Sequence, residues 1–198
     1  MTVLSPPTRT AIRDLLSLAW PVVLARIGIM TMGLTDVIVV GNWSARELAY
    51  SSLALAPVTI FVTTAVGLMM GVQVMTARYL GEGRRHAVGG VFRRGMAYGL
   101  QLGMASMLAM IVFGPWALRH MGLADGLGEG ASPALIVFAL SMPGYLVSVA
   151  AQFFLEALNR PKAGMWAMWV ANAVNLALNL LLVPDLLGLG INGALASA

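Results

Sequence analysis

The sequence has no cysteine and only two histidines among its 198 residues. Disulfide bonds and thiolate metal sites are therefore excluded, because both need cysteine sulfur. The histidines, His86 and His120, lie near the ends of apolar segments and form no cluster with other metal ligands. No convergent set of acid, base and nucleophile is visible either. The sequence therefore predicts neither an enzyme nor a protein with a bound cofactor.

Charge is also scarce. Only 10% of the residues are charged and 59% are hydrophobic, whereas ordinary soluble domains have about 25% and roughly 45–50%. Apolar stretches of about 20 residues recur along the chain, which is the length that an α-helix needs to cross a bilayer core of about 30 Å. Because no water is available in lipid, each segment must pair its own backbone groups, as an α-helix does. The composition predicts an all-α integral membrane protein.

Five full membrane spans and the start of a sixth can be placed. They lie at about 15–40, 54–77, 95–118, 134–158 and 164–183, with the sixth beginning near 191. Residues 1–14 form a tail, and residues 15–198 form one transmembrane lobe. The first span lacks a convincing small-residue cleavage site, so we expect it to remain in the mature protein.

The basic residues indicate how the chain is oriented. The net charge is +4, but these residues are concentrated in the tail and in alternate short connections, which argues against nucleic-acid binding. They are Arg9, Arg13, Arg78, Arg84, Arg85, Arg93, Arg94, Arg160 and Lys162. The other connections are neutral or acidic. By the positive-inside rule, the N-terminus is cytoplasmic, and the lipid bilayer is the expected partner.

Asp36 is the most informative polar residue in these spans. It lies before the outer end of the first span, too deep for a loop residue. Such a carboxylate is costly to place in lipid, so it usually faces the bundle interior or binds a cation. The alternative is a residue at the outer interface that reaches water.

Arg26 lies in the same span, about 15 Å from Asp36 along the helix axis, so the two cannot form a direct ion pair. Three environments remain open for it: a water-filled cavity, a pair with Glu156 near the end of the fourth span, or a position where it snorkels along lipid. Pro21 can bend the first span because it lacks a backbone N–H. Asn172 and Tyr145 complete the set of candidates for a cavity or for helix bending.

The fifth span carries a stripe of amides. Asn172, Asn175 and Asn179 are spaced i, i+3, i+7, which places them on one helical face. Asparagine amides can hold a neighbouring helix by hydrogen bonds or offer carbonyl oxygens to a hard cation. The acidic residue in the first span favours the second role.

Small residues predict close helix packing. Gly95, Gly99 and Gly103 repeat at every fourth position on the third span, and Gly67 and Gly71 do so on the second. Such stripes let helices approach closely. We expect both stripes to pack against neighbouring helices.

Several segments resemble the multidrug and toxic compound extrusion (MATE) family of transporters. Pro21, followed by Asp36 within the segment 32–41 (MGLTDVIVVG), resembles the family's first helix. The segments 47–49 (ELA), 77–83 (ARYLGEG), 158–161 (LNRP) and 190–197 (GINGALAS) resemble further parts of the family in the same order. Together they extend over nearly the whole chain.

The resemblance implies a transporter of twelve helices in two lobes, of which this chain is the N-terminal one. It implies cation-coupled export of small organic, often cationic, compounds across the bacterial inner membrane, with the C-terminal lobe as partner. In the family, the aspartate corresponding to Asp36 binds the coupling H⁺ or Na⁺. Asn175, Asn179 and Ser197 occupy the positions of its polar partners.

Two departures from the family and two rival functions bear on this prediction. Asn179 stands where one branch has a second aspartate, which disfavours a two-carboxylate proton site, and Ser197 replaces a common threonine but keeps the hydroxyl. A flippase for lipid-linked precursors would share the fold but should line its cavity with several basic residues, and only Arg26 qualifies. A truncated, inactive lobe is the other alternative.

Overall fold

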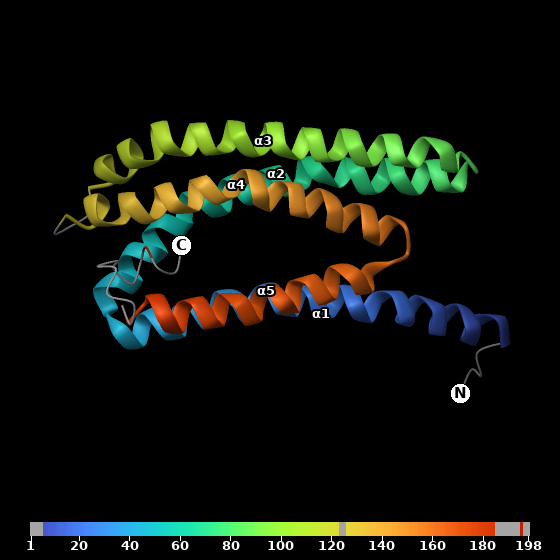
Figure 1. Ribbon diagram of the computed structural model, residues 1–198, viewed down its shortest axis with the longest axis horizontal. Coiled ribbons are helices and arrows are strands. Elements are labelled where there is room, and N and C mark those ends of the chain that lie inside the picture. Colours follow the sequence, from blue (N-terminus) through green and yellow to red (C-terminus); the bar gives the residue numbers. More distant parts are fainter. Residues whose placement is uncertain (1–5, 123–125, 185–194, 196–198) are drawn as a thin grey trace.

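The computed structural model describes residues 6–122, 126–184 and 195, and these ranges contain long α-helices and no strand (Figure 1). The helices are α1 (Pro6–Trp43), α2 (Ala45–Gly81), α3 (Arg85–His120), α4 (Leu127–Ala157) and α5 (Pro161–Leu182). All five are long and apolar enough to cross a membrane. The predicted all-α class is confirmed. The expected sixth span lies outside the described residues.

The helices extend beyond the apolar segments that the sequence suggested. The largest difference is at 41–53, expected as a connection, because α2 begins at Ala45, directly after α1. The Ser44 side chain accepts a hydrogen bond from the Glu47 backbone N–H at 3.3 Å and so caps the first turn of α2. A search for apolar runs underestimates helix length because polar residues near the membrane surface continue the helix.

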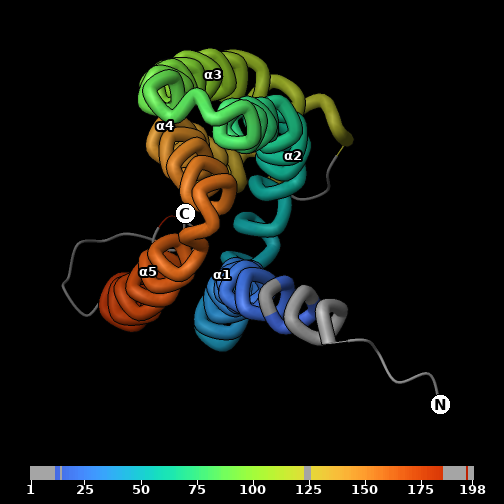
Figure 2. The backbone as a smooth tube through the Cα atoms, turned by 90° about the vertical axis from the view of Figure 1, so that its right-hand side faces the viewer, coloured from blue at the N-terminus to red at the C-terminus, as the bar shows by residue number. Residues whose placement is uncertain are grey.

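The helices form two groups. α2, α3 and α4 pack together, while α1 and α5 form a pair (Figure 1), and the end-on view separates the pair from the three-helix group (Figure 2). The N-terminal part of α2 connects the groups, and α2 contains Pro57. α1 and α5 run in the same direction, as two odd-numbered spans should (Figure 1).

The glycine stripe on α3 lies in close helix contacts, as predicted. A Cβ atom added at Gly99 would lie 2.9 Å from the Leu146 carbonyl oxygen, and one at Gly103 would lie 3.0 Å from that of Met142. The backbones of α3 and α4 therefore touch at Gly99 and Gly103, while a Cβ atom at Gly95 would lie 2.8 Å from the Val72 side chain of α2. The prediction for Gly67 and Gly71 on α2 was wrong, because no described neighbour lies within 4 Å of a Cβ at either position. Spacing defines a helical face but not whether another helix covers it.

Candidate functional site

Asp36 and the amides of α5 meet where α1 and α5 pack together. The Oδ1 atom of Asp36 accepts hydrogen bonds from Asn175 Nδ2 at 3.1 Å and from Asn179 Nδ2 at 2.6 Å. The carboxylate is half-buried, Asn175 is partly buried and Asn179 is 1% exposed. Hydrogen bonds donated to one carboxylate oxygen stabilise its ionised form. The structure thus brings together three of the four residues expected at the cation site. Ser197 lies outside the described residues.

The side-chain amide of Asn179 has one hydrogen-bond acceptor that no described residue uses. Its amide nitrogen also donates to Asn175 Oδ1 at 3.2 Å, but its own Oδ1 is buried and has no hydrogen-bond partner among the described residues. Leaving such an atom unbonded costs about 1–3 kcal/mol. The cluster therefore combines a carboxylate with an unsatisfied amide oxygen, and hard oxygen ligands of this kind suit small cations. The oxygen atoms of this cluster fit a small cation such as Na⁺ as well as a proton on Asp36.

Asn172, the third amide of the stripe, has a different role. Its Nδ2 atom donates to the carbonyl oxygens of Gly28 and Met168, both at 3.0 Å. A Cβ atom at Gly28 would lie 2.9 Å from Met168 Cγ, so the two helices approach closely at this glycine. Asn172 therefore links α5 to α1 through its own hydrogen bonds. None of the hydrogen bonds described for Asn172 involves the Asp36 carboxylate.

A cavity of about 340 Å³ is lined by residues of the α1–α5 pair, of α2 and of α4. Its polar lining includes Arg26, Tyr145, Ser148 and Gln152, and the remaining lining is apolar: Ile29, Met32, Val66, Val149, Phe153, Ala167, Met168 and Ala171. Of the residues expected at a cavity or a bend, Arg26 and Tyr145 line this space. Pro21 is buried elsewhere in α1, which continues as a helix through it.

The sequence left three environments open for Arg26, and the structure bears on two of them, the cavity and the pair with Glu156. Arg26 lies on the cavity wall, and no salt bridge joins it to Glu156 in the described part of the chain. Glu156 accepts a hydrogen bond from Gln73 Nε2 at 3.3 Å instead. Arg26 is nevertheless close enough to act electrostatically on Glu156. The cavity therefore has a cationic wall, with a hydrogen-bonded carboxylate nearby.

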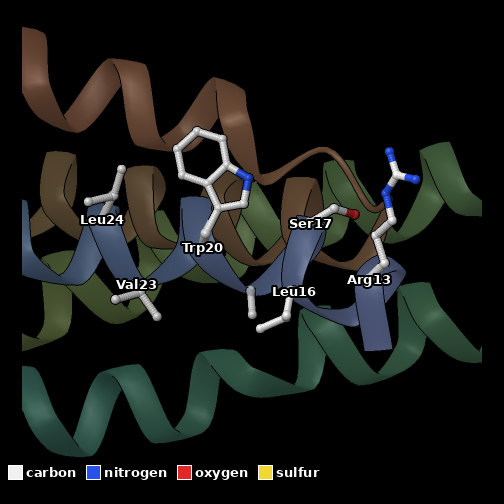
Figure 3. Close-up of a pocket in the computed structure, with 7 residues that line it drawn as sticks. Arg13, Leu16, Ser17, Trp20, Val23 and Leu24 are labelled. Atoms are coloured by element: carbon white, nitrogen blue, oxygen red, sulfur yellow. The ribbon is translucent and has the colours of Figure 1, made fainter. Parts of the chain in front are cut away.

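A second, more open groove of about 600 Å³ follows the N-terminal half of α1. Figure 3 shows the side chains around it, among them Arg13, Leu16, Trp20 and Val23, and all of its lining residues come from α1. Lys162 on α5 lies 6.0 Å from the centroid of the Trp20 ring. Because no polar groups from different helices converge here, this groove is a weaker candidate site than the Asp36 cluster or the Arg26 cavity.

Sequence reasoning missed two features around the site. Gly28 was not singled out, since no second glycine lies four residues away to form a small-residue stripe. The hydrogen bond between Gln73 and Glu156 joins residues 83 positions apart; the sequence marked Glu156 only as a candidate partner of Arg26, and Gln73 belongs to no recognisable pattern. The Ser-x-x-Glu pattern of Ser44 and Glu47, which could have indicated the start of α2, was not used either.

Comparison with known proteins identifies relatives for most of the chain. Residues 21–181 match the MatE family. The probable multidrug resistance protein NorM of Caulobacter vibrioides is 55% identical over 192 residues, which are 97% of this chain and 41% of that protein. The proteins of the same name from Neisseria meningitidis serogroups A and B are each 28% identical over 183 residues, covering 90% of this chain and 39% of theirs. This chain thus spans about two-fifths of the length of these relatives.

A solved structure has the same fold. It is a transporter of the MOP superfamily from Pyrococcus furiosus, for which a reversed polarity of the binding pocket was taken to suggest a different function. The TM-score is 0.83 and the sequence identity 21%, and the match covers 93% of this chain and 41% of that one. At this identity, the likeness establishes the arrangement of helices alone.

Proposed function

The chain belongs to the MatE family, and on this premise we propose that it is the N-terminal lobe of a cation-coupled exporter of small organic compounds. Proteins of this family are transporters and not enzymes, and the five long apolar helices make this chain part of a multi-pass membrane protein. In the proposal, a C-terminal lobe completes the transporter, the N-terminus is cytoplasmic, and the membrane is the bacterial inner membrane.

One observation carries the proposal: the Asp36 carboxylate is held by two amides of α5, and one of these amides has a buried oxygen that no group in the described part of the chain bonds. A carboxylate that only stabilised the fold would be expected to have a cationic partner or a fully bonded network. Within the ranges that the structure describes, the hydrogen-bond partners of Asp36 are neutral, and the Oδ1 acceptor of Asn179 is unused. Such a cluster is suited to bind and release a cation.

In the proposed mechanism, the ionised Asp36 is stabilised by the amide N–H groups of Asn175 and Asn179 until H⁺ or Na⁺ arrives. Rotation of the Asn179 amide exchanges its donor for its acceptor, so the same side chain can serve the bare carboxylate or a bound Na⁺. Ser197 is proposed as a further oxygen ligand. Neutralising Asp36 removes the cost of a charge in lipid and changes the relative stability of the inward- and outward-open arrangements.

The cavity beside Arg26 is the proposed place for part of the substrate. Its largely apolar wall suits lipophilic organic molecules, and Tyr145 offers an aromatic ring with a polar end. Pro21 is proposed as the point where α1 bends during transport. Arg26 is the one basic residue among those that line the cavity, so the lining does not favour a flippase for lipid-linked precursors.

The test is Asp36→Asn in the full-length protein, reconstituted into proteoliposomes, with efflux driven by an imposed H⁺ or Na⁺ gradient. We expect ion-driven efflux to be abolished while membrane insertion and yield stay normal, because the amide keeps the shape of the side chain but cannot carry the charge. Glu129→Gln, an equal charge change at an exposed position in the first turn of α4, is the matched control and should transport normally. Wild-type efflux from Asp36→Asn would reject the assignment.

A further inference from the structure

A pocket of about 630 Å³ opens between the turn that joins α2 to α3 and the turn that joins α4 to α5. It is lined by Leu80, Arg85, Val88, Leu158, Asn159 and Arg160. The charged residues on it are both arginines, and the aliphatic side chains supply an apolar part. Both turns lie on the side that the distribution of basic residues predicts to be cytoplasmic.

The arginines near this pocket differ in whether their charge is balanced. Glu82 forms salt bridges with two arginines: its Oε1 atom lies 2.8 Å from Arg78 Nε, and its Oε2 atom lies 3.4 Å from Arg84 Nη1. The hydrogen bond from Arg78 lowers the pKa of Glu82, so this carboxylate is ionised at neutral pH and offsets positive charge in the turn. Arg85 and Arg160 have no such carboxylate within salt-bridge distance in the described part of the chain. The pocket is therefore lined by two uncompensated guanidinium groups.

The backbone helps to hold this arrangement. Asn159 has a φ of 55°, a left-handed conformation that asparagine tolerates better than most residues. The next N–H, that of Arg160, donates to the Leu155 carbonyl at 2.9 Å, which closes the end of α4 and places Arg160 at the start of α5. Arg85 is likewise the first residue of α3. Both positions lie at a helix N-terminus, where the positive end of the helix dipole adds to the positive potential of the arginine.

We propose that this pocket binds the phosphate headgroup of an anionic phospholipid of the surrounding leaflet. Guanidinium groups match phosphate oxygens in a bidentate geometry, and basic pockets between transmembrane helices are known to take anionic headgroups. Leu80, Val88 and Leu158 give the pocket an apolar side, which suits the glycerol and first methylene groups of a lipid but gives a free inorganic anion no advantage. This inference stands on the pocket and its charges, and does not depend on the proposed transport activity.

The experiment measures lipid binding to the full-length protein in detergent, by native mass spectrometry, with phosphatidylglycerol and phosphatidylcholine as probes. We expect phosphatidylglycerol to bind more tightly and Arg85→Gln/Arg160→Gln to weaken it about 30-fold, from about 1 kcal/mol per basic residue at the membrane surface and tenfold per 1.4 kcal/mol. Each single variant should weaken it about fivefold by the same conversion. The single variants decide the question if the double variant does not fold.

The matched control is Arg78→Gln/Arg84→Gln, which removes the same two charges from the neighbouring turn. It also leaves the negative charge of Glu82 unpaired. If lipid affinity depended only on the net positive charge of this surface, the control would therefore lose at least as much affinity for phosphatidylglycerol as the pocket variant. We expect the control to stay within about twofold of the wild type, because neither arginine lines the pocket and Glu82 already offsets part of their charge. Equal loss in both double variants would overturn the proposal. So would equal affinity for the two lipids, or displacement of phosphatidylglycerol by millimolar inorganic phosphate.

Discussion

Replacing Asn179 by leucine separates the proposed role of the amide stripe in ion binding from its role in packing. The change removes both the 2.6 Å hydrogen bond to Asp36 and the amide oxygen for which the described residues offer no partner, while it keeps a branched side chain of similar shape. A hydrogen bond to a charged group contributes about 1.5–3 kcal/mol, so the ion concentration at half-maximal transport should change about tenfold to 150-fold. The ion whose half-saturation changes identifies the coupling ion.

The measurement is the rate of efflux from proteoliposomes at varied H⁺ and, separately, varied Na⁺ concentration. Asn172→Leu is the control from the same helical face, because its amide bonds Gly28 and Met168 carbonyls and not Asp36. It should lower the free energy of unfolding by about 0.5–1.5 kcal/mol, the usual net value of a neutral hydrogen bond, and leave the ion dependence unchanged. An unchanged ion dependence in Asn179→Leu, or equal shifts in both variants, would refute the reasoning.

Two further predictions concern stability. Gly103→Ala should lower the free energy of unfolding in a denaturant titration by about 1–3 kcal/mol, because the new Cβ meets the backbone of α4, whereas Gly71→Ala faces open space and should gain about 0.5–1 kcal/mol in helix propensity. Equal stability of the two variants would contradict the packing described here. Ser44→Ala should cost about 0.5–2 kcal/mol by removing the cap of α2, and Ser44→Asp, which restores an acceptor, should recover most of the loss.

The sequence was sufficient to predict the helices and much of the candidate site. Apolar runs of membrane-spanning length predict the five helices because lipid leaves the backbone no other way to pair its polar groups. The i, i+3, i+7 spacing predicts the shared face of the asparagines, which follows from helix geometry alone. These are local consequences of the chain, so they can be inferred without knowing which helices are neighbours.

What could not be predicted depends on those neighbours. The stripes at 95–103 and 67–71 have the same four-residue spacing, yet only the first meets another backbone, because α4 covers that face of α3. The three asparagines likewise share one face, but Asn172 lies opposite a carbonyl and Asn179 opposite a carboxylate. Arg26 lines a cavity that exists only once four helices have packed. The sequence alone therefore gave no reason to prefer one of the three environments considered for its side chain.

The α1–α5 pair offers a short route between the proposed ion and substrate sites. Met32 lines the Arg26 cavity and lies one helical turn from Asp36 on α1, and Ala171 lines it one turn from Asn175 on α5. α1 and α5 pack more extensively with each other than with the rest of the bundle, and Asn172 ties them together beside the cavity. In the proposed mechanism, an ion at Asp36 and a substrate in the cavity therefore act on the same two helices about one turn apart. Mutual exclusion of the two ligands then needs only a small shift of this pair, without a relay through the α2–α4 group.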